Sequence, residues 1–372
     1  MKGKGERPVL TIAGAMSGTS LDGVDIAVIE TDGTDVLRFG KTANRRYTPN
    51  EQAQIRAAFG LWPGDGRVPA AARVVEAAHA DAMAGLDAVT ALGFHGQTLA
   101  HDPQNGRTHQ AGDGACLSDT LGLPVIWDFR SADMALGGHG APLAPFYHWA
   151  LARRLRALAP IAFLDLGGMG TISWVDPTSD APEADGALMA FDTGPATAPL
   201  DDLMRVRRAG RYDTDGAQTS AGTADMAAVA AFLDDGYFLK MPPKSLDRNA
   251  FPYLVPAFET LSVEDALATL AACAAASVAQ ALSFLPQVPA RVLVSGGGRH
   301  NRGLMAALGA ALPCPVAPVE TAGLDGDALE AQAIAYLAAR VALGMTTSAP
   351  GTTGVPAAVG GGQVSGDLRL DR

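Results

Sequence analysis

The stretch from Gly14 to Asp25, with the sequence GAMSGTSLDGVD, constrains the fold more than any other in the chain. An apolar run leads into it, and residues 24–29 alternate between two faces, as the residues of a strand do. We therefore expect two antiparallel strands joined by a loop rich in glycine and hydroxyl groups. Backbone N–H groups in such a loop suit phosphate, and Asp22 and Asp25 add oxygens for a hydrated magnesium ion. The competing interpretation is an ordinary polar hairpin turn.

Bulk properties indicate a two-domain globular protein. The chain has 372 residues, of which 48% are hydrophobic and 18% charged. Its net charge of −11 argues against nucleic acid or an anionic membrane as a partner. Three widely spaced cysteines indicate a reducing compartment, and the first eight residues lack the apolar core of a signal peptide. The alanine-rich run 270–285 contains Ser277 and Gln280, which favours a packed helix over a membrane span, so we expect a cytoplasmic protein.

Two polar motifs follow expected strands in the first half. The apolar segment 91–94 ends in His95, Gly96, Gln97 and Thr98, and α/β sheets bind ligands at such strand ends. A structural role for His95 is an equally open interpretation. The strand at 123–127 precedes Arg130, whose planar fork suits an anionic or hydroxyl-rich substrate, and Asp133, which suits a sugar hydroxyl. An Arg–Asp surface pair is the alternative.

The second half begins as the first does, with a glycine-rich hairpin. Gly167 and Gly168 separate the expected strands 161–166 and 171–175, which makes a weak internal repeat. Asp192 follows an apolar strand at 187–191, where it is placed either for proton transfer or to cap the next helix. Residues 242–245, Pro-Pro-Lys-Ser, place Lys244 near a phosphate or simply in solvent.

A run of three glycines near the C-terminal end follows the expected strand 291–295. The spacing from Gly296 is G-x-G-x-x-N, so the dinucleotide fingerprint is incomplete and a Rossmann oxidoreductase is a distant alternative. Glycines here allow a flat ring or a ribose to approach the backbone closely. The segment 327–343 is expected to be the last long helix, followed by a loop-rich tail with at most one short strand, at 357–359.

Taken together, these motifs resemble those of the anhydro-N-acetylmuramic acid kinase family, part of the sugar kinase, Hsp70 and actin superfamily. The similarity runs nearly end to end, over eight ordered motifs at residues 14–25, 95–98, 128–133, 137–143, 191–195, 242–245, 295–301 and 327–331. It implies an α/β fold of two RNase H-like (actin-like ATPase) lobes with a nucleotide cleft between them. The first lobe would comprise residues 1–142 and 327–372, and the second residues 143–326.

The resemblance also implies the roles of particular residues. Asp192 matches the catalytic base, and Asp22 and Asp25 would hold Mg²⁺. Residues matching the sugar pocket are His95, Gln97, Thr98, Arg130, Asp133 and Glu330. Those matching the ATP site are Gly18, Thr19, Ser20, Leu21, Asp22, Gly23, Val24, Asp25, Gly167, Gly168, Gly296, Gly297, Gly298 and Asn301.

The activity implied is ATP-dependent phosphorylation of O6 of 1,6-anhydro-N-acetylmuramic acid while water opens the anhydro bridge, in peptidoglycan recycling. The partners would be ATP and the anhydro sugar, in a family that tends to dimerise. Three positions depart from the family pattern: Ala196-Thr197 replaces Gly-Asn, Met169-Gly170-Thr171 replaces Ile-Ala-Asn, and Leu246-Asp247-Arg248-Asn249 replaces Thr-Gly-Arg-Glu. A kinase for another 1,6-anhydro sugar, such as levoglucosan, and a non-catalytic regulator of the same fold remain alternatives.

Overall fold

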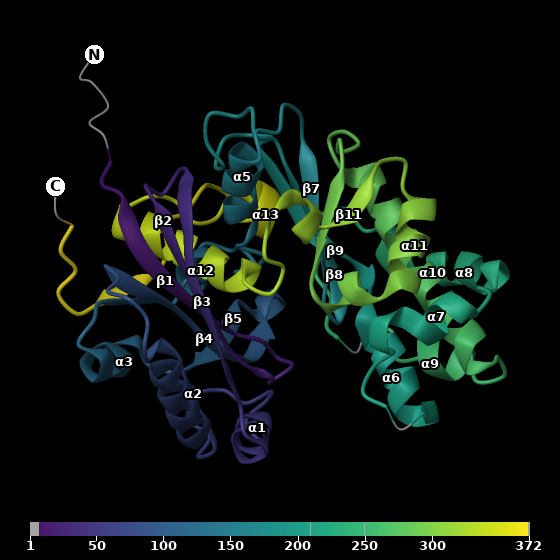
Figure 1. Cartoon of the computed structure of the whole chain (residues 1–372), viewed down its shortest axis with the longest axis horizontal. Coiled ribbons are helices and arrows are strands. Elements are labelled where there is room, and N and C mark those ends of the chain that lie inside the picture. The colour runs from purple at the N-terminus through teal and green to yellow at the C-terminus, as the bar shows by residue number, and fades with distance from the viewer. Residues whose placement is uncertain (1–6, 209, 249, 371–372) are drawn as a thin grey trace. The chain divides into compact units, whose positions relative to one another are not determined.

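The structure is a computed structural model that describes residues 7–208, 210–248 and 250–370 (Figure 1). The chain divides into two compact units. Unit 1 is formed by residues 1–154, 180–185 and 327–372, and unit 2 by residues 155–179 and 186–326. Each unit is a β-sheet with helices packed on it, which is an α/β architecture.

The sheet of unit 1 has the strand order β12-β6-β4-β1-β2-β3, with β5 paired to β4. β2 is antiparallel to both of its neighbours, whereas β1, β4 and β6 are parallel. The strands are β1 (Leu10–Ser17), β2 (Gly23–Thr31), β3 (Val36–Arg46), β4 (Ala91–Asp102), β5 (Arg107–Ala111), β6 (Val125–Trp127) and β12 (Gln363–Ser365). β1 and β2 are buried along most of their length on both faces, which explains why they read as apolar runs.

The sheet of unit 2 has the order β11-β10-β7-β8-β9. Its strands are β7 (Ile161–Leu166), β8 (Met169–Val175), β9 (Leu188–Pro195), β10 (Val292–Ser295) and β11 (Val316–Pro318). β8 is antiparallel to both neighbours, and β7, β10 and β11 are parallel. With β5 and β12 set aside, both sheets have the order third, second, first, fourth, fifth, so each unit is RNase H-like. This shared order accounts for the glycine-rich hairpin that opens each half of the sequence.

Helix α12 (Leu329–Ala342) packs closely on β1, β2 and β4, and Figure 1 shows its yellow ribbon beside the purple strands. A Cβ atom on Gly14 would lie 2.0 Å from the carbonyl oxygen of Ala331, and one on Gly93 would lie 2.8 Å from that of Ile334. Glycine is therefore required at these two positions, where the helix crosses β1 and β4. The other helices of unit 1 are α1 (Pro49–Arg56), α2 (Val68–Met83), η1 (Pro103–Asn105), α3 (Gly114–Leu121), α4 (Ser131–Ala135), α5 (Pro145–Arg154) and α13 (Pro350–Thr353).

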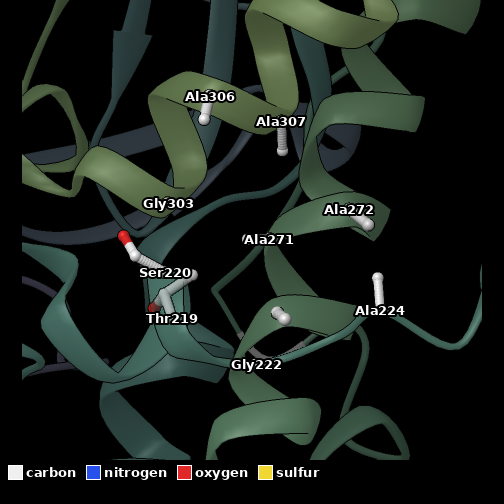
Figure 2. A pocket seen from close by; sticks show the side chains of 10 residues that line it. Thr219, Ser220, Gly222, Ala224, Ala271, Ala272, Gly303, Ala306 and Ala307 are labelled. Carbon is white, nitrogen blue, oxygen red and sulfur yellow. The ribbon is translucent and has the colours of Figure 1, made fainter.

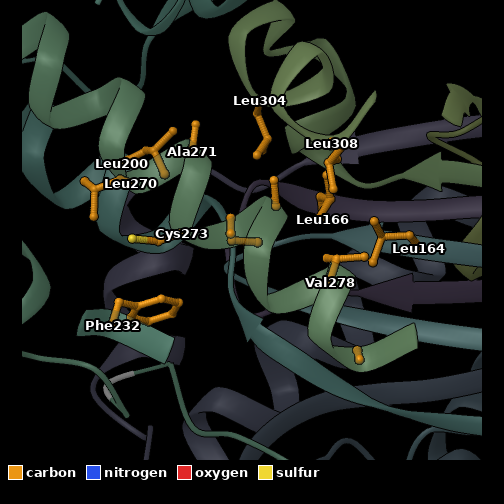
Figure 3. Packing of buried hydrophobic residues seen from close by; sticks show 14 of the residues in the cluster. Leu164, Leu166, Leu200, Phe232, Leu270, Ala271, Cys273, Val278, Leu304 and Leu308 are labelled. Atoms are coloured by element: carbon orange, nitrogen blue, oxygen red, sulfur yellow. The ribbon is translucent and has the colours of Figure 1, made fainter. Parts of the chain in front are cut away.

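The core of unit 2 forms between its sheet and helix α10 (Val263–Ala281). Figure 3 shows side chains of α10, such as Leu270 and Val278, in one cluster with Leu164 and Leu166 of β7. The segment Val263–Phe284 is long and apolar enough to cross a membrane, but two thirds of it, 67%, is buried inside the protein. The other helices of unit 2 are α6 (Thr197–Arg208), η2 (Thr214–Gly216), α7 (Ala217–Ala221), α8 (Met226–Leu233), η3 (Gly236–Leu239), α9 (Leu254–Ala257), η4 (Leu282–Phe284), η5 (Gly297–His300), α11 (Arg302–Ala311) and η6 (Val319–Ala322).

The division between the units falls after Arg154, not after residue 142 as the sequence suggested. The reason is that α5 packs within unit 1, where the Tyr147 hydroxyl donates to Gln332 Oε1 at 2.7 Å and Arg154 donates to the carbonyl of Val36 at 2.8 Å. Residues 180–185 also belong to unit 1, where Glu183 pairs with the buried Arg340 at 2.8 Å.

Three expected strand boundaries differ from the observed ones. β4 continues through His95 to Asp102 because it pairs with β5, so the His95–Thr98 motif lies inside a strand. β9 continues to Pro195, so Asp192 also lies inside a strand and does not cap α6. In the tail, the strand is Gln363–Ser365, paired with β6, while Val359 forms only an isolated bridge with Ser348.

Candidate active site

The loop between β1 and β2 comprises residues 18–22. Thr19 and Ser20 are exposed, whereas the side chain of Leu21 is buried and anchors the loop in the core. The Leu21 N–H donates to the Gly18 carbonyl at 3.2 Å, and Leu21 has a φ of +56°, a left-handed conformation that is strained for leucine. The buried side chain of Leu21 thus fixes the loop to the core, and the side chains of Thr19 and Ser20 face solvent.

Gln97 supports this loop from β4. Its side chain is completely buried, accepts a hydrogen bond from Ser17 Oγ at 2.5 Å and donates to the Gly18 carbonyl at 3.3 Å. The two ends of the amide therefore contact the last residue of β1 and the first residue of the loop. Thr98, the next residue, accepts from Gln110 at 3.1 Å.

The two carboxylates proposed for magnesium lie at the start of β2. Ser20 Oγ donates to Asp22 Oδ1 at 2.8 Å, and Asn44 Nδ2 donates to Asp25 Oδ1 at 2.7 Å. Among the described residues, no group of three or more His, Cys, Asp or Glu side chains is arranged to hold a metal ion. A magnesium ion here would therefore need phosphate and water oxygens to complete its shell, which is how Mg²⁺ is usually bound beside a nucleotide.

The second hairpin turns at Gly167 and Gly168, whose carbonyls accept hydrogen bonds from the backbone N–H groups of residues 196–198 at the start of α6. Beside it lies Asp165, a carboxylate that the sequence analysis overlooked. Ser295 Oγ donates to Asp165 Oδ1 at 3.1 Å, and burial raises the pKa of Asp165 above its usual range. The sequence places Asp165 inside an otherwise apolar strand. This position could have marked it as a candidate site residue, because charged residues are rarely buried without a function or a partner.

The turn at Gly296 packs directly on the second hairpin. Gly296 has a φ of +71°, and a Cβ atom there would lie 2.6 Å from the carbonyl carbon of Leu166 and 2.7 Å from Asp165 Oδ1. The side chain of Asn301 caps α11, because its Oδ1 accepts from the Leu304 N–H at 2.9 Å. Its Nδ2 donates to Thr219 Oγ1 at 3.2 Å.

A pocket of about 270 Å³ lies beside Thr219, between α7, α10 and α11. Figure 2 shows that short side chains surround it, with hydroxyls at one end. The lining residues are Thr219, Ser220, Gly222, Ala224, Ala268, Ala271, Ala272, Gly303, Ala306 and Ala307. Through the Asn301–Thr219 hydrogen bond the pocket adjoins the glycine turn.

Buried His95 and half-buried Arg130 form a pair in unit 1. Arg130 Nε and Nη2 lie 3.1 and 3.0 Å from His95 Nε2, and His95 Nδ1 lies 3.0 Å from the Gly96 carbonyl. Since the guanidinium only donates, Nε2 accepts and the imidazole is neutral. Burial, with the charge of Arg130, lowers the pKa of His95 to about 3. Burial also lowers the pKa of Arg130 to about 10, while Glu330 opposes that shift.

The guanidinium of Arg130 is bonded to neutral acceptors within the described residues, His95 and the Gly140 carbonyl at 3.4 Å. The nearby carboxylate of Glu330 acts on its charge, and its remaining N–H groups can donate to an anionic ligand. Asp133, by contrast, is 2% exposed and accepts from the Gly140 N–H at 2.7 Å and from Thr353 Oγ1 at 2.6 Å. The interpretation of Arg130 and Asp133 as a surface pair is thus wrong. The hydrogen bonds of Asp133 connect Gly140 of the glycine-rich loop to Thr353 of the C-terminal tail.

Asp192 lies on β9 opposite Thr171 of β8. Thr171 Oγ1 donates to Asp192 Oδ1 at 2.7 Å, and the Leu246 N–H donates to Oδ2 at 2.8 Å. Burial raises the pKa of Asp192 above its usual range, and these two donors oppose that effect. From the sequence, Thr171 and Leu246 were noted only as departures from the family pattern, because their contacts with Asp192 follow from strand register and loop path.

Known sequences match nearly the whole chain. The family model for anhydro-N-acetylmuramic acid kinase matches residues 10–365. Curated proteins of that name from Cereibacter sphaeroides and from Ruegeria sp. (strain TM1040) are 58% and 56% identical over 352 residues, which are 95% of this chain and 95% and 94% of theirs. Among solved structures, a ROK family glucokinase from Streptomyces griseus is 13% identical, covers 88% of this chain and 98% of its own, and gives a TM-score of 0.42. By its sequence relatives, the chain belongs to the anhydro-N-acetylmuramic acid kinase family.

Proposed function

We propose that the protein is a cytoplasmic, ATP-dependent kinase of peptidoglycan recycling that opens 1,6-anhydro-N-acetylmuramic acid and phosphorylates its O6. The observation that carries the proposal is the setting of Asp192. Each of its oxygens accepts one hydrogen bond, from Thr171 and from Leu246, and a carboxylate oxygen can accept two. A water molecule can therefore bind the carboxylate without displacing either donor.

Asp192 acts as the general base in this proposal. It takes a proton from the water that attacks the anomeric carbon, the C1–O6 bond breaks, and O6 forms a bond to the γ-phosphorus of ATP as ADP leaves. The raised pKa of Asp192 suits this task, because a stronger base removes the proton more readily.

The two glycine hairpins are proposed to hold the phosphates of ATP. The exposed Thr19 hydroxyl is a donor of the required kind, and the half-buried turn at Gly167 and Gly168 lets a phosphate approach the backbone closely. Asp22 and Asp25 would hold Mg²⁺ together with the phosphates, and the ion would neutralise the charge of the transferred group. The pocket beside Thr219, next to the glycine turn at Gly296, is proposed for the adenine base.

Arg130 supports the muramic sugar over levoglucosan. N-acetylmuramic acid carries a lactyl carboxylate, which levoglucosan lacks, and a planar guanidinium pairs with a carboxylate through two parallel hydrogen bonds. The neutral imidazole of His95 orients Arg130 without cancelling its charge.

The test is an ADP-release assay with ATP and Mg²⁺, with 1,6-anhydro-N-acetylmuramic acid and levoglucosan as separate substrates, for the wild type and Arg130→Met. We expect turnover on the muramic sugar and a KM for it at least about 10- to 100-fold higher in the variant, because it loses the two charge-assisted hydrogen bonds to the carboxylate. Turnover on levoglucosan alone would replace the proposed substrate while keeping the kinase chemistry. ATP binding without turnover on either sugar would favour a regulator.

A further inference from the structure

Lys244 is a buried cation without a carboxylate partner among the described residues. Its side chain is 8% exposed. The ammonium Nζ lies 4.4 Å from the ring centroid of Phe284, 4.7 Å from that of Tyr237 and 5.5 Å from that of Phe191. Its one hydrogen bond within the described chain is a long one, 3.5 Å, to the carbonyl of Tyr237. Three aromatic rings thus take the place that a carboxylate usually has beside a buried ammonium group.

The residues of this aromatic cage are also the neighbours of Asp192. Phe191 precedes Asp192 on β9, and the hydroxyl of Tyr237 donates to the Asp192 carbonyl. The backbone of Lys244 itself accepts from the Asp192 N–H at 3.1 Å. Two residues further on, Leu246 provides the N–H that binds the Asp192 carboxylate at 2.8 Å.

Through these contacts the 242–246 segment positions a hydrogen-bond donor at the Asp192 carboxylate. The segment lies outside any helix or strand, so no ladder of backbone hydrogen bonds fixes its position. Its neighbours Ser245 and Asp247 are exposed, whereas Lys244 is buried. The side chain of Lys244 is therefore the anchor that holds the Leu246 N–H at the carboxylate.

We propose that Lys244 is a positioning residue for Asp192, and that its caged ammonium keeps the 242–246 segment in the place where Leu246 donates to the carboxylate. The inference rests on the proposed role of Asp192 as the base. It names a contribution of Lys244 to the reaction that requires no contact with the sugar or with phosphate.

Within the described part of unit 2, charged groups act on Lys244, Asp192 and Tyr237. Lys240, at the end of η3, acts on Lys244, and together with burial, the larger cause, it lowers the pKa of Lys244 to about 8. Asp165 of β7 acts on Asp192, and Asp192 acts on Tyr237. Near neutral pH the ammonium is mostly charged, which is the form that the three rings attract.

Loss of the Lys244 side chain should change the pKa of Asp192 in a predictable direction. When the Leu246 N–H moves away, the ionised carboxylate of Asp192 loses a donor, so its pKa rises further. The acid limb of the kcat profile then moves to higher pH. A merely structural loss lowers the amount of folded enzyme at every pH and leaves the limb where it was.

The experiment measures kcat, both KM values and the pH profile of kcat for the wild type, Asp192→Asn, Lys244→Met, Lys244→Arg and the control Lys240→Met, which removes an exposed lysine of the same region. For Lys244→Met we expect kcat to fall about 10- to 100-fold with the KM for ATP unchanged, and the acid limb to shift to higher pH. Lys244→Arg, which keeps the cation in the cage, should recover much of kcat. Lys240→Met should resemble the wild type.

The outcomes separate the two proposals. Full turnover by Asp192→Asn would overturn the role of the base itself. Loss of turnover in Asp192→Asn together with wild-type kcat and an unshifted limb in Lys244→Met would overturn the positioning role alone. If Lys244→Met does not fold, Phe284→Leu removes one ring and leaves the 242–246 segment intact, and an unshifted acid limb in that variant contradicts the inference.

Discussion

Replacement of Asp192 by asparagine tests the proposed base with the least disturbance of the fold. The two hydrogen bonds of the carboxylate come from Thr171 Oγ1 at 2.7 Å and the Leu246 N–H at 2.8 Å. An asparagine can keep both, because its oxygen accepts from Leu246 and its amide donates to the threonine hydroxyl, which can rotate to accept. Folding and ATP affinity should therefore stay close to those of the wild type.

The chemical step should suffer greatly, since a neutral amide cannot take the proton of the attacking water. General base catalysis contributes about 10²- to 10⁴-fold, so the activation barrier should rise by about 2.7 to 5.4 kcal/mol. The assay is single-turnover ADP formation with 1,6-anhydro-N-acetylmuramic acid, alongside nucleotide binding by calorimetry. The matched control is Asp225→Asn in the same unit, where the carboxylate caps α8 and asparagine caps equally well.

A kcat for Asp192→Asn within tenfold of the wild type would refute this reasoning. The pH profile provides a second check. Because burial raises the pKa of Asp192 and the ionised form is the base, kcat should fall as pH drops through that raised pKa, above the usual range of an aspartate. Thr171→Val removes a donor to the ionised form and should move this acid limb to still higher pH.

Three further predictions concern packing, the pocket and acid stability. Gly14→Ala should lower the free energy of unfolding by about 3 kcal/mol or more in a denaturant titration, because its Cβ would overlap the backbone of α12. The control Gly309→Ala, whose Cβ would lie in open space on α11, should be neutral or stabilising. Ala306→Trp places a large side chain in the pocket beside α11, so it should raise the KM for ATP and leave the KM for the sugar unchanged. Ala310→Trp, on the same helix but outside the pocket lining, is the control. A KM for ATP in Ala306→Trp equal to that of the wild type would contradict the adenine assignment. Burial lowers the pKa of His79 from 6.5 to about 4, so the unfolded chain binds a proton that the folded one refuses, and stability should fall as pH drops from 6.5 towards 4. Over that pH range the free energy of unfolding of His79→Leu should fall less than that of the wild type, by up to about 1.4 kcal/mol per pH unit. Urea unfolding at pH 7 and pH 5 measures the difference.

The elements with the strongest periodicity could be predicted from the sequence. The hairpin of β1 and β2, the strand β7 and the helix α12 follow the expected ranges closely because apolar spacing and burial agree there. β3 was not foreseen, since most of its residues are exposed and polar and it is held as an edge strand by pairing with β2. β12 has no apolar signal either, and it exists only through its pairing with β6.

The structure connects the candidate site residues in ways that the sequence does not show. Strand ends were expected at His95 and at Asp192, yet both strands continue, because pairing with β5 and β8 extends them beyond their apolar runs. The contact between Thr171 and Asp192 joins residues on different strands, and register between strands is not written in either segment alone. Burial of Lys244 was likewise invisible in a segment rich in proline and polar residues.

The departures from the family pattern acquire a chemical meaning in the structure. Thr171 stands where the family usually has asparagine, and its hydroxyl donates to Asp192 as an amide would. Leu246 stands where threonine is usual, but it serves Asp192 through its backbone N–H, which every residue except proline possesses. Thr197 replaces asparagine and donates to the Gly167 carbonyl at 3.0 Å. These three residues each keep a donor in place, so these changes provide no argument for a different sugar. In the proposed function, the choice between substrates depends instead on whether Arg130 meets a carboxylate.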